Sequence, residues 1–176
     1  MRKHLKSKEM FRARSPILSL WNIYIYRSPT VVRRGRGGER DGDGDMVRVA
    51  STFDINRGTH ETLTISAWFL VEDASDDSRK QVIYEQGSGS RGLNIYVYDG
   101  KLYGGGWNTP QDESGWGGKW VATDKVRSGP WHHVALVLNG GPTIKPAAVV
   151  AYLDGDQIGG RQGSQLWHHS GAVGLG

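Results

Sequence analysis

Residues 81–107 carry the clearest pattern of apolar and polar positions in the chain, and they predict three consecutive β-strands. Residues 81–86 are β-branched and aromatic, a glycine–serine loop follows, and residues 93–98 alternate strictly between apolar and polar side chains. Asp99 and Gly100 then separate two alternating runs, which is the typical sequence of a two-residue hairpin turn.

A two-residue turn fixes the register of this hairpin. The expected pairs are Tyr98 with Lys101, Val97 with Leu102, Tyr96 with Tyr103, and Asn94 with Gly105. The face expected to enter the core carries Leu93, Ile95, Val97 and Leu102. The other face carries Asn94, Tyr96, Tyr98, Lys101, Tyr103, Gly105 and Trp107. Such a face suits a polar ring-shaped ligand, because aromatic rings stack while amides and hydroxyls orient it. A half-exposed sheet face whose tyrosines serve β-propensity explains the pattern equally well.

Two later segments complete the pattern of elements. Residues 109–124 are rich in glycine and are expected to form a long loop that carries Trp116 and Trp120. Residues 130–139 are apolar on both faces, which predicts a central strand.

Composition narrows the fold class. The 176 residues include 26 Gly, seven Trp and seven Tyr, and short β-rich runs recur at regular spacing. These features predict one all-β domain, a sandwich or a barrel. The chain has no cysteine, so disulfide and thiolate chemistry are excluded, while the cellular compartment stays open.

The net charge of +4 is unevenly distributed. Residues 1–45 hold 11 Lys and Arg against 5 Asp and Glu, whereas residues 46–176 hold 11 against 13. We therefore place a domain boundary at residue 46 and expect a basic segment before it that is disordered or separate from the domain. A secretory signal or anchor in the apolar run 16–26 and a foreign N-terminus are the alternatives. That run is too short to span a membrane, and a nucleic-acid function would rest on the basic segment alone.

Motifs of catalysis are weak. Residues 87–92 match G-x-G-x-x-G, but a strand follows where a dinucleotide-binding site needs a helix. The pairs His132-His133 and His168-His169 cannot easily bind one ion, because adjacent strand residues point to opposite faces. Glycoside hydrolysis needs two carboxylates, and Glu85 is the only inward-capable carboxylate in the expected strands. We therefore expect no enzymatic activity.

Calcium has two candidate segments. Residues 41–45 look like the start of an EF-hand loop, but Met46 stands where the turn glycine belongs and Thr52 where the bidentate glutamate belongs. Residues 72–80 are rich in carboxylates that could chelate calcium. A solvated linker and a solvated turn are the alternative interpretations.

Several stretches together resemble the bacterial laminin-G-like branch of the concanavalin A-like lectin/glucanase superfamily. They are DINRGTHETLTISAWF (54–69), QVIYEQGSGSRGLNIYVYDGKLYGGGWN (81–108), PWHHVALVLNG (130–140), AYLDGDQIGG (151–160) and SQLWHHSGAVGLG (164–176). The resemblance covers residues 46–176 and implies a jelly-roll β-sandwich of two antiparallel sheets. It also implies a non-catalytic module of secreted or cell-surface proteins that binds glycans or matrix molecules, with calcium as the possible cofactor. Members of this branch continue past the last stretch, so the module is expected to lack its last strand or strands.

The resemblance and the polar hairpin face together suggest a carbohydrate- or matrix-binding adhesion module. Its ligand-binding residues would be Asn94, Tyr96, Tyr103, Trp107, Asn108 and Trp116. The aromatic residues would stack on sugar rings, while the two asparagines would orient hydroxyl groups. The alternative is a structural spacer domain, or a gene fragment, of a large multi-domain surface protein with no ligand of its own. A loop 109–124 that covered the aromatic residues would favour the spacer.

Overall fold

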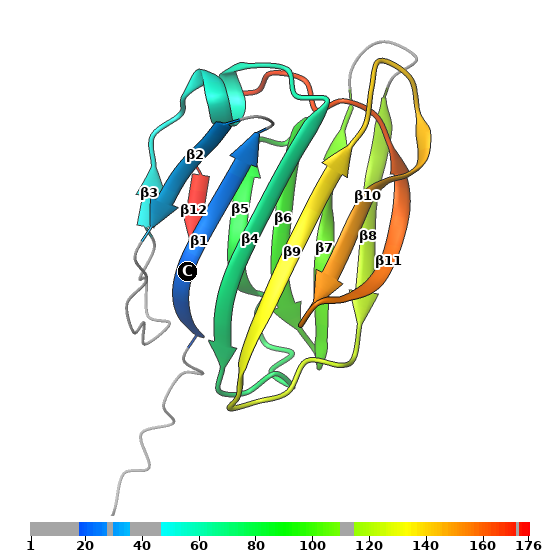
Figure 1. The fold of residues 1–176 in the computed structure, drawn as a ribbon. Coiled ribbons are helices and arrows are strands. Elements are labelled where there is room, and N and C mark those ends of the chain that lie inside the picture. The colour runs from blue at the N-terminus through cyan, green and yellow to red at the C-terminus, as the bar shows by residue number, and fades with distance from the viewer. Residues whose placement is uncertain (1–17, 28–29, 36–46, 110–114, 172) are drawn as a thin grey trace, which may run out of the picture.

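The computed structural model describes residues 18–27, 30–35, 47–109, 115–171 and 173–176, with the backbone alone for 18–27, 30–35 and 47. These residues form a sandwich of two six-stranded antiparallel sheets (Figure 1). The predicted all-β fold of two antiparallel sheets is therefore confirmed.

Each sheet combines segments that lie far apart in the chain. The first sheet has the order β11 (Asp156–Gly163), β10 (Lys145–Leu153), β9 (Trp131–Asn139), β4 (Thr62–Val71), β1 (Leu18–Arg27) and β2 (Thr30–Gly35). The second has the order β3 (Val47–Val49), β12 (Val173–Leu175), β5 (Gln81–Gly87), β6 (Arg91–Tyr98), β7 (Lys101–Asn108) and β8 (Trp116–Thr123). One turn of π-helix, η1 (Phe53–Arg57), lies between β3 and β4.

The β6–β7 hairpin has the predicted register. Asp99 and Gly100 form the turn with φ angles of 47° and 73°, which aspartate tolerates and glycine adopts freely. The observed pairs include Tyr98 with Lys101, Val97 with Leu102, Tyr96 with Tyr103, and Asn94 with Gly105. The local pattern and the turn thus determined which side chains enter the core.

The core lies between the two sheets and is built by alternation along the strands. β4 buries every second residue from Leu63 to Val71, and β9 buries Val134, Leu136 and Leu138 against them. β9 lies between β10 and β4, as the apolar character of both its faces predicted.

The N-terminal part of the chain differs from the expectation of a separate segment. β1 pairs with β4 from Leu18–Val71 to Tyr26–Thr64, and β2 extends the same sheet. The apolar run that resembled a signal sequence is here a strand, which supplies hydrogen-bond partners to an edge that β4 would otherwise expose. Residues 18–35 therefore share a sheet with the later strands, and the boundary at residue 46 stays a prediction. Residues 1–17 and 36–46, which include the candidate calcium segment 41–45, lie outside the described residues.

Residues 109–124 were expected to form a long loop, and this prediction is wrong for their second half. Trp116–Thr123 forms β8, which pairs with β7 through contacts such as Gly104–Val121 and Gly105–Trp120. The glycines at 117 and 118 weakened the strand signal of this segment, but the pairing with β7 stabilises it nonetheless. β8 therefore extends the sheet sideways and does not cover its face.

Candidate functional site

The outward face of the second sheet carries a group of large side chains on β6, β7 and β8. We call Asn94, Tyr96, Tyr103, Trp107 and Trp120 the aromatic face. Tyr96 lies opposite Tyr103, and Asn94 and Trp120 both lie opposite Gly105. Alternation along the strands turns all five away from the core, since Leu93, Ile95 and Val121 between them are buried.

The two tryptophans of the aromatic face lie side by side across glycine backbone. Their ring centroids are 6.3 Å apart and their planes are inclined by 27°. A Cβ atom added at Gly92 would lie 2.7 Å from the Trp107 ring, and one added at Gly118 would lie 2.2 Å from the Trp120 ring. The glycines therefore make room for the indoles to lie close to the sheet. Both indoles remain half-buried, so part of each ring is open to solvent.

Hydrogen bonds hold both indoles in place. Trp107 Nε1 donates to the carbonyl oxygen of Ser88 at 2.9 Å, and Trp120 Nε1 donates to Asn94 Oδ1 at 2.7 Å. Because Asn94 Oδ1 accepts this bond, the Asn94 amide nitrogen is the group that can donate to a ligand. The rings are thus oriented before any ligand arrives, which lowers the entropic cost of binding.

Tyr96 is less available than the sequence suggested. Its ring stacks on that of Tyr103 at 4.9 Å with an inclination of 11°, and the ammonium group of Lys80 lies 4.7 Å from its centroid. The two tyrosine rings are too close to admit the ammonium between them, so Lys80 covers the second face of Tyr96. Only 8% of Tyr96 is exposed, and burial, with Tyr103 nearby, raises the pKa of its hydroxyl. Tyr96 therefore has no open ring face for a ligand, whereas the stacking role of Tyr103 stays a prediction.

Asn108 and Trp116 do not lie on the aromatic face, which corrects two of the predicted ligand contacts. Asn108 follows Trp107 directly and so points to the opposite side, and it pairs in register with Trp116. Both side chains are buried, with exposed fractions of 0% and 2%, and Asn108 Nδ2 donates to the carbonyl oxygen of Gln165. They help to build the interior of the sandwich.

The ligand-binding residues predicted from the sequence do not include Trp120, which the structure places on the aromatic face. The alternation of Trp120 with buried Val121 was a usable signal, but it required residues 116–123 to be read as a strand. Glu85 is a further polar neighbour, since it is exposed on β5 directly opposite Asn94.

The acidic loop before β5 uses its carboxylates for local turns. Asp73 Oδ1 accepts hydrogen bonds from the amide and hydroxyl of Ser75, and Asp76 Oδ1 accepts the same two bonds from Ser78. The bonds from Ser78 lower the pKa of Asp76. In the part of the chain that the structure describes, no three His, Cys, Asp or Glu side chains are grouped so as to hold a metal ion. These residues therefore offer no carboxylate cage for calcium, whose binding stays a prediction.

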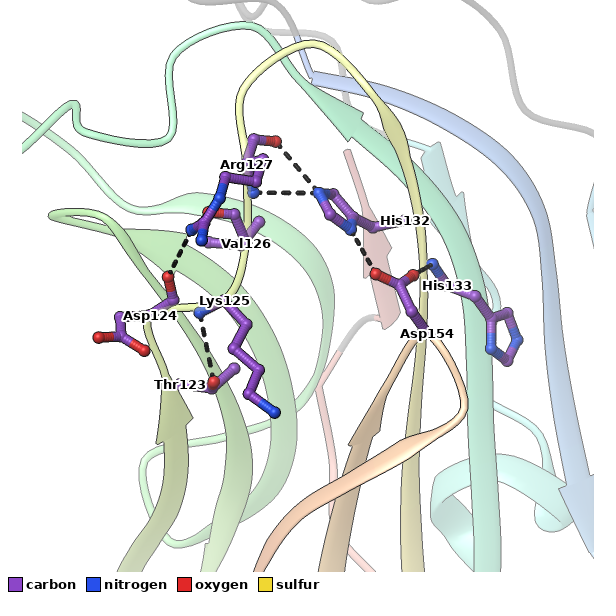
Figure 2. A network of polar contacts seen from close by, with 8 residues as sticks. All are labelled: Thr123, Asp124, Lys125, Val126, Arg127, His132, His133 and Asp154. Atoms are coloured by element: carbon purple, nitrogen blue, oxygen red, sulfur yellow. Dashed lines mark hydrogen bonds and ion pairs between the residues drawn. The ribbon is translucent and has the colours of Figure 1, made fainter.

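The histidine pairs have structural contacts. Figure 2 shows buried His132 between Asp154, which lies 2.7 Å from Nδ1, and the amide of Arg127, which donates to Nε2 at 3.0 Å. Nε2 also lies 3.2 Å from the carbonyl oxygen of Arg127, so both ring nitrogens of His132 have partners. Asp154 Oδ1 also accepts from the amide of His133. This network joins the β8–β9 connection to the β10–β11 turn.

A comparison with known families identifies the fold. A family model of the laminin G type, described as the concanavalin A-like lectin/glucanases superfamily, matches residues 41–176. The match begins after β2, so the first two strands lie outside it. No curated protein matches the chain. Among the described residues, no helix has the length and apolar character needed to cross a membrane. The chain therefore belongs to the laminin G-like proteins of the concanavalin A-like lectin/glucanase superfamily, whose domains are typically binding modules without catalytic activity.

Proposed function

We propose that this protein is a non-catalytic, extracellular carbohydrate-binding module that uses the aromatic face for adhesion. The observation that carries the proposal is the pair of half-buried indoles of Trp107 and Trp120, each held by a hydrogen bond from its ring nitrogen. Oriented aromatic rings on an open sheet face suit the flat apolar side of a sugar ring. The described part of the 109–124 segment lies beside this face, which favours a binding module over a spacer.

The neighbouring polar groups complement the two rings. The Asn94 amide can donate to a sugar hydroxyl, while the exposed carboxylate of Glu85 across the strand pair can accept from one. Tyr103 lies opposite Tyr96 and extends the aromatic face along β7. Ring stacking then supplies affinity and the polar pair supplies orientation.

The test measures the affinity of the wild-type protein and of three tryptophan variants for a panel of soluble polysaccharides. Trp107→Ala and Trp120→Ala should each weaken binding by about fivefold or more, since a buried aromatic contact contributes more than about 1 kcal/mol to binding. Trp68→Ala is the matched control, because Trp68 is 45% exposed on the first sheet, away from the aromatic face. Isothermal titration calorimetry measures affinity, and thermal melting shows that each variant folds.

The two functions predict different results. Selective loss of binding in the two face variants supports a lectin-like module. A wild-type protein that melts cooperatively but binds none of the polysaccharides would instead support a structural spacer. Melting in calcium and in EDTA tests the cofactor in the same experiment, because an ion bound to the native state raises the melting temperature.

A further inference from the structure

Residues 164–171 connect the two sheets and make several contacts with other parts of the chain. We call this segment, which runs from the end of β11 toward β12, the strap. Its Leu166 exchanges two backbone hydrogen bonds with His60, at 2.7 and 2.8 Å. The amide of His169 donates to the carbonyl oxygen of Asn56, and Asn56 Nδ2 donates to that of Gly171 at 2.8 Å. The strap therefore holds β12 in place through contacts centred on His169 and Asn56.

The side chain of His169 is buried, and its partners define its tautomer. Nδ1 lies 2.9 Å from the carbonyl oxygen of Trp167, which can only accept, so Nδ1 carries the hydrogen. Nε2 lies 3.3 Å from the amide nitrogen of Gln86, which can only donate, so Nε2 is an acceptor. The structure thus requires a neutral imidazole at this position.

The amide of Gln86 cannot easily turn over to suit a charged imidazole. The hydroxyl of buried Tyr84 donates to Gln86 Oε1, and Gln86 Nε2 also faces the carbonyl oxygen of Ile55 at 3.5 Å. Turning the amide over would take the acceptor away from the Tyr84 hydroxyl proton and would place an acceptor against the Ile55 carbonyl oxygen. The donor that faces His169 Nε2 is therefore set by two further residues.

The groups around His169 do not compensate a positive charge at Nε2. From β6, Arg91 approaches the strap and donates to the carbonyl oxygen of His168 at 2.9 Å. From β5 come the neutral Gln86 and Tyr84, and η1 contributes backbone carbonyl groups while its charged residues, Asp54 and Arg57, are exposed. Burial first, and then the charges of Arg91 and His168, lower the pKa of His169 against the opposing bond to Trp167.

We propose that His169 makes the strap an acid-sensitive latch, which is closed when the imidazole is neutral and opens when it is protonated. Protonation places an N–H on Nε2 against the Gln86 amide, so two donors face each other inside the protein. Opening exposes His169 to water and removes that conflict. The expected consequence is that residues 164–171 and β12 separate from β5 and η1 in mildly acidic solution, while the rest of the sandwich stays folded.

The direction and size of the effect follow from linkage. In the open strap His169 has its ordinary pKa of 6.5, whereas in the closed strap its pKa is lower. The closed strap therefore has its full stability above pH 6.5. Its stability relative to the open strap decreases as the pH falls below that value. At about pH 5 the opening equilibrium can increase by at most about 30-fold, the ratio of charged to neutral imidazole in the open state.

Hydrogen exchange with mass spectrometry measures strap opening directly. Peptides from the strap and β12, compared at about pH 7 and about pH 5 after correction for intrinsic exchange rates, should lose protection by several-fold up to that limit in the wild-type protein. Peptides from β6 and β9 should keep theirs. Strap protection that does not change with pH would overturn the proposal.

Three variants assign the effect to His169. His169→Asn should remove the acid response, and the neighbouring, exposed His168 supplies the matched control His168→Asn, which should keep it. Gln86→Glu offers a second test should His169→Asn not fold. Its carboxylate still accepts from Tyr84 and also accepts from a protonated His169, so it should abolish or reverse the acid response. A response lost in His168→Asn, or unchanged in both His169→Asn and Gln86→Glu, would refute the latch.

Discussion

Replacing Asp154 should weaken the junction between the β8–β9 connection and the β10–β11 turn. Its carboxylate accepts from His132 Nδ1 at 2.7 Å and from the amide of His133 at 2.8 Å. Its backbone adopts a φ of 53°, which aspartate and asparagine tolerate better than alanine does. Asp154→Ala therefore removes two hydrogen bonds and also strains the turn.

The magnitude can be worked out from these contacts. Hydrogen bonds to a charged group contribute about 1.5–3 kcal/mol each, but the Asp154 side chain is 48% exposed, so about 1 kcal/mol each is the better figure. The left-handed conformation adds about 1 kcal/mol for alanine. Asp154→Ala should thus lower the free energy of unfolding by about 3 kcal/mol. For a domain of this size that is about 6–12 °C in melting temperature.

Chemical denaturation and thermal melting can separate the two contributions. Asp154→Gly keeps the turn geometry and loses only the carboxylate, so it should cost about 2 kcal/mol. Asp99→Ala is the matched control, because Asp99 has the same place in the β6–β7 turn with a φ of 47°. Its hydrogen bond to Asp76 is made by the backbone, so alanine should cost only about 1 kcal/mol there. The reasoning fails if Asp154→Ala costs no more than Asp99→Ala, or if Asp154→Gly is as stable as the wild type.

Two further substitutions test the interior and the strand contact beneath the aromatic face. Tyr84→Phe leaves the buried oxygen of Gln86 without its donor and should cost about 1–3 kcal/mol in urea denaturation; a loss below about 0.5 kcal/mol would contradict this. Gly105→Ala places a Cβ 2.1 Å from the carbonyl oxygen of Lys119, so it should separate β7 from β8 and cost at least about 2 kcal/mol. Gly117→Ala, where a Cβ meets nothing within 4 Å, is the control and should cost less than about 0.5 kcal/mol; equal losses at the two glycines would refute the steric argument.

Part of this structure could be read from local sequence. Strict alternation and the Asp99–Gly100 turn together specify the register of β6 with β7, because both the turn type and the side-chain period are local properties. The same reasoning placed Leu93 and Ile95 in the core, and the apolar faces of residues 130–139 predicted a central strand.

The candidate ligand residues show where this reasoning stops. Asn108 and Trp116 have the composition of a binding site, but their strand parity and mutual pairing turn both inward. Tyr96 does lie on the outward face, as its position in the alternation requires, yet Lys80 and Tyr103 cover its ring. Composition indicates which side chains can stack on a ligand, whereas packing decides which rings remain open.

The sequence by itself determined the fold class, the hairpin at the centre of the second sheet and the set of aromatic residues near the candidate site. Only the tertiary structure decided that β1 pairs with β4, that β8 brings Trp120 beside Trp107, and that His169 of the strap is buried against β5 and η1. The physical reason is the separation of the interacting residues along the chain. Turn geometry and side-chain alternation depend only on residues a few positions apart. The partners of β1, Trp120 and His169 come from distant parts of the chain, and their contacts exist only once the two sheets have assembled.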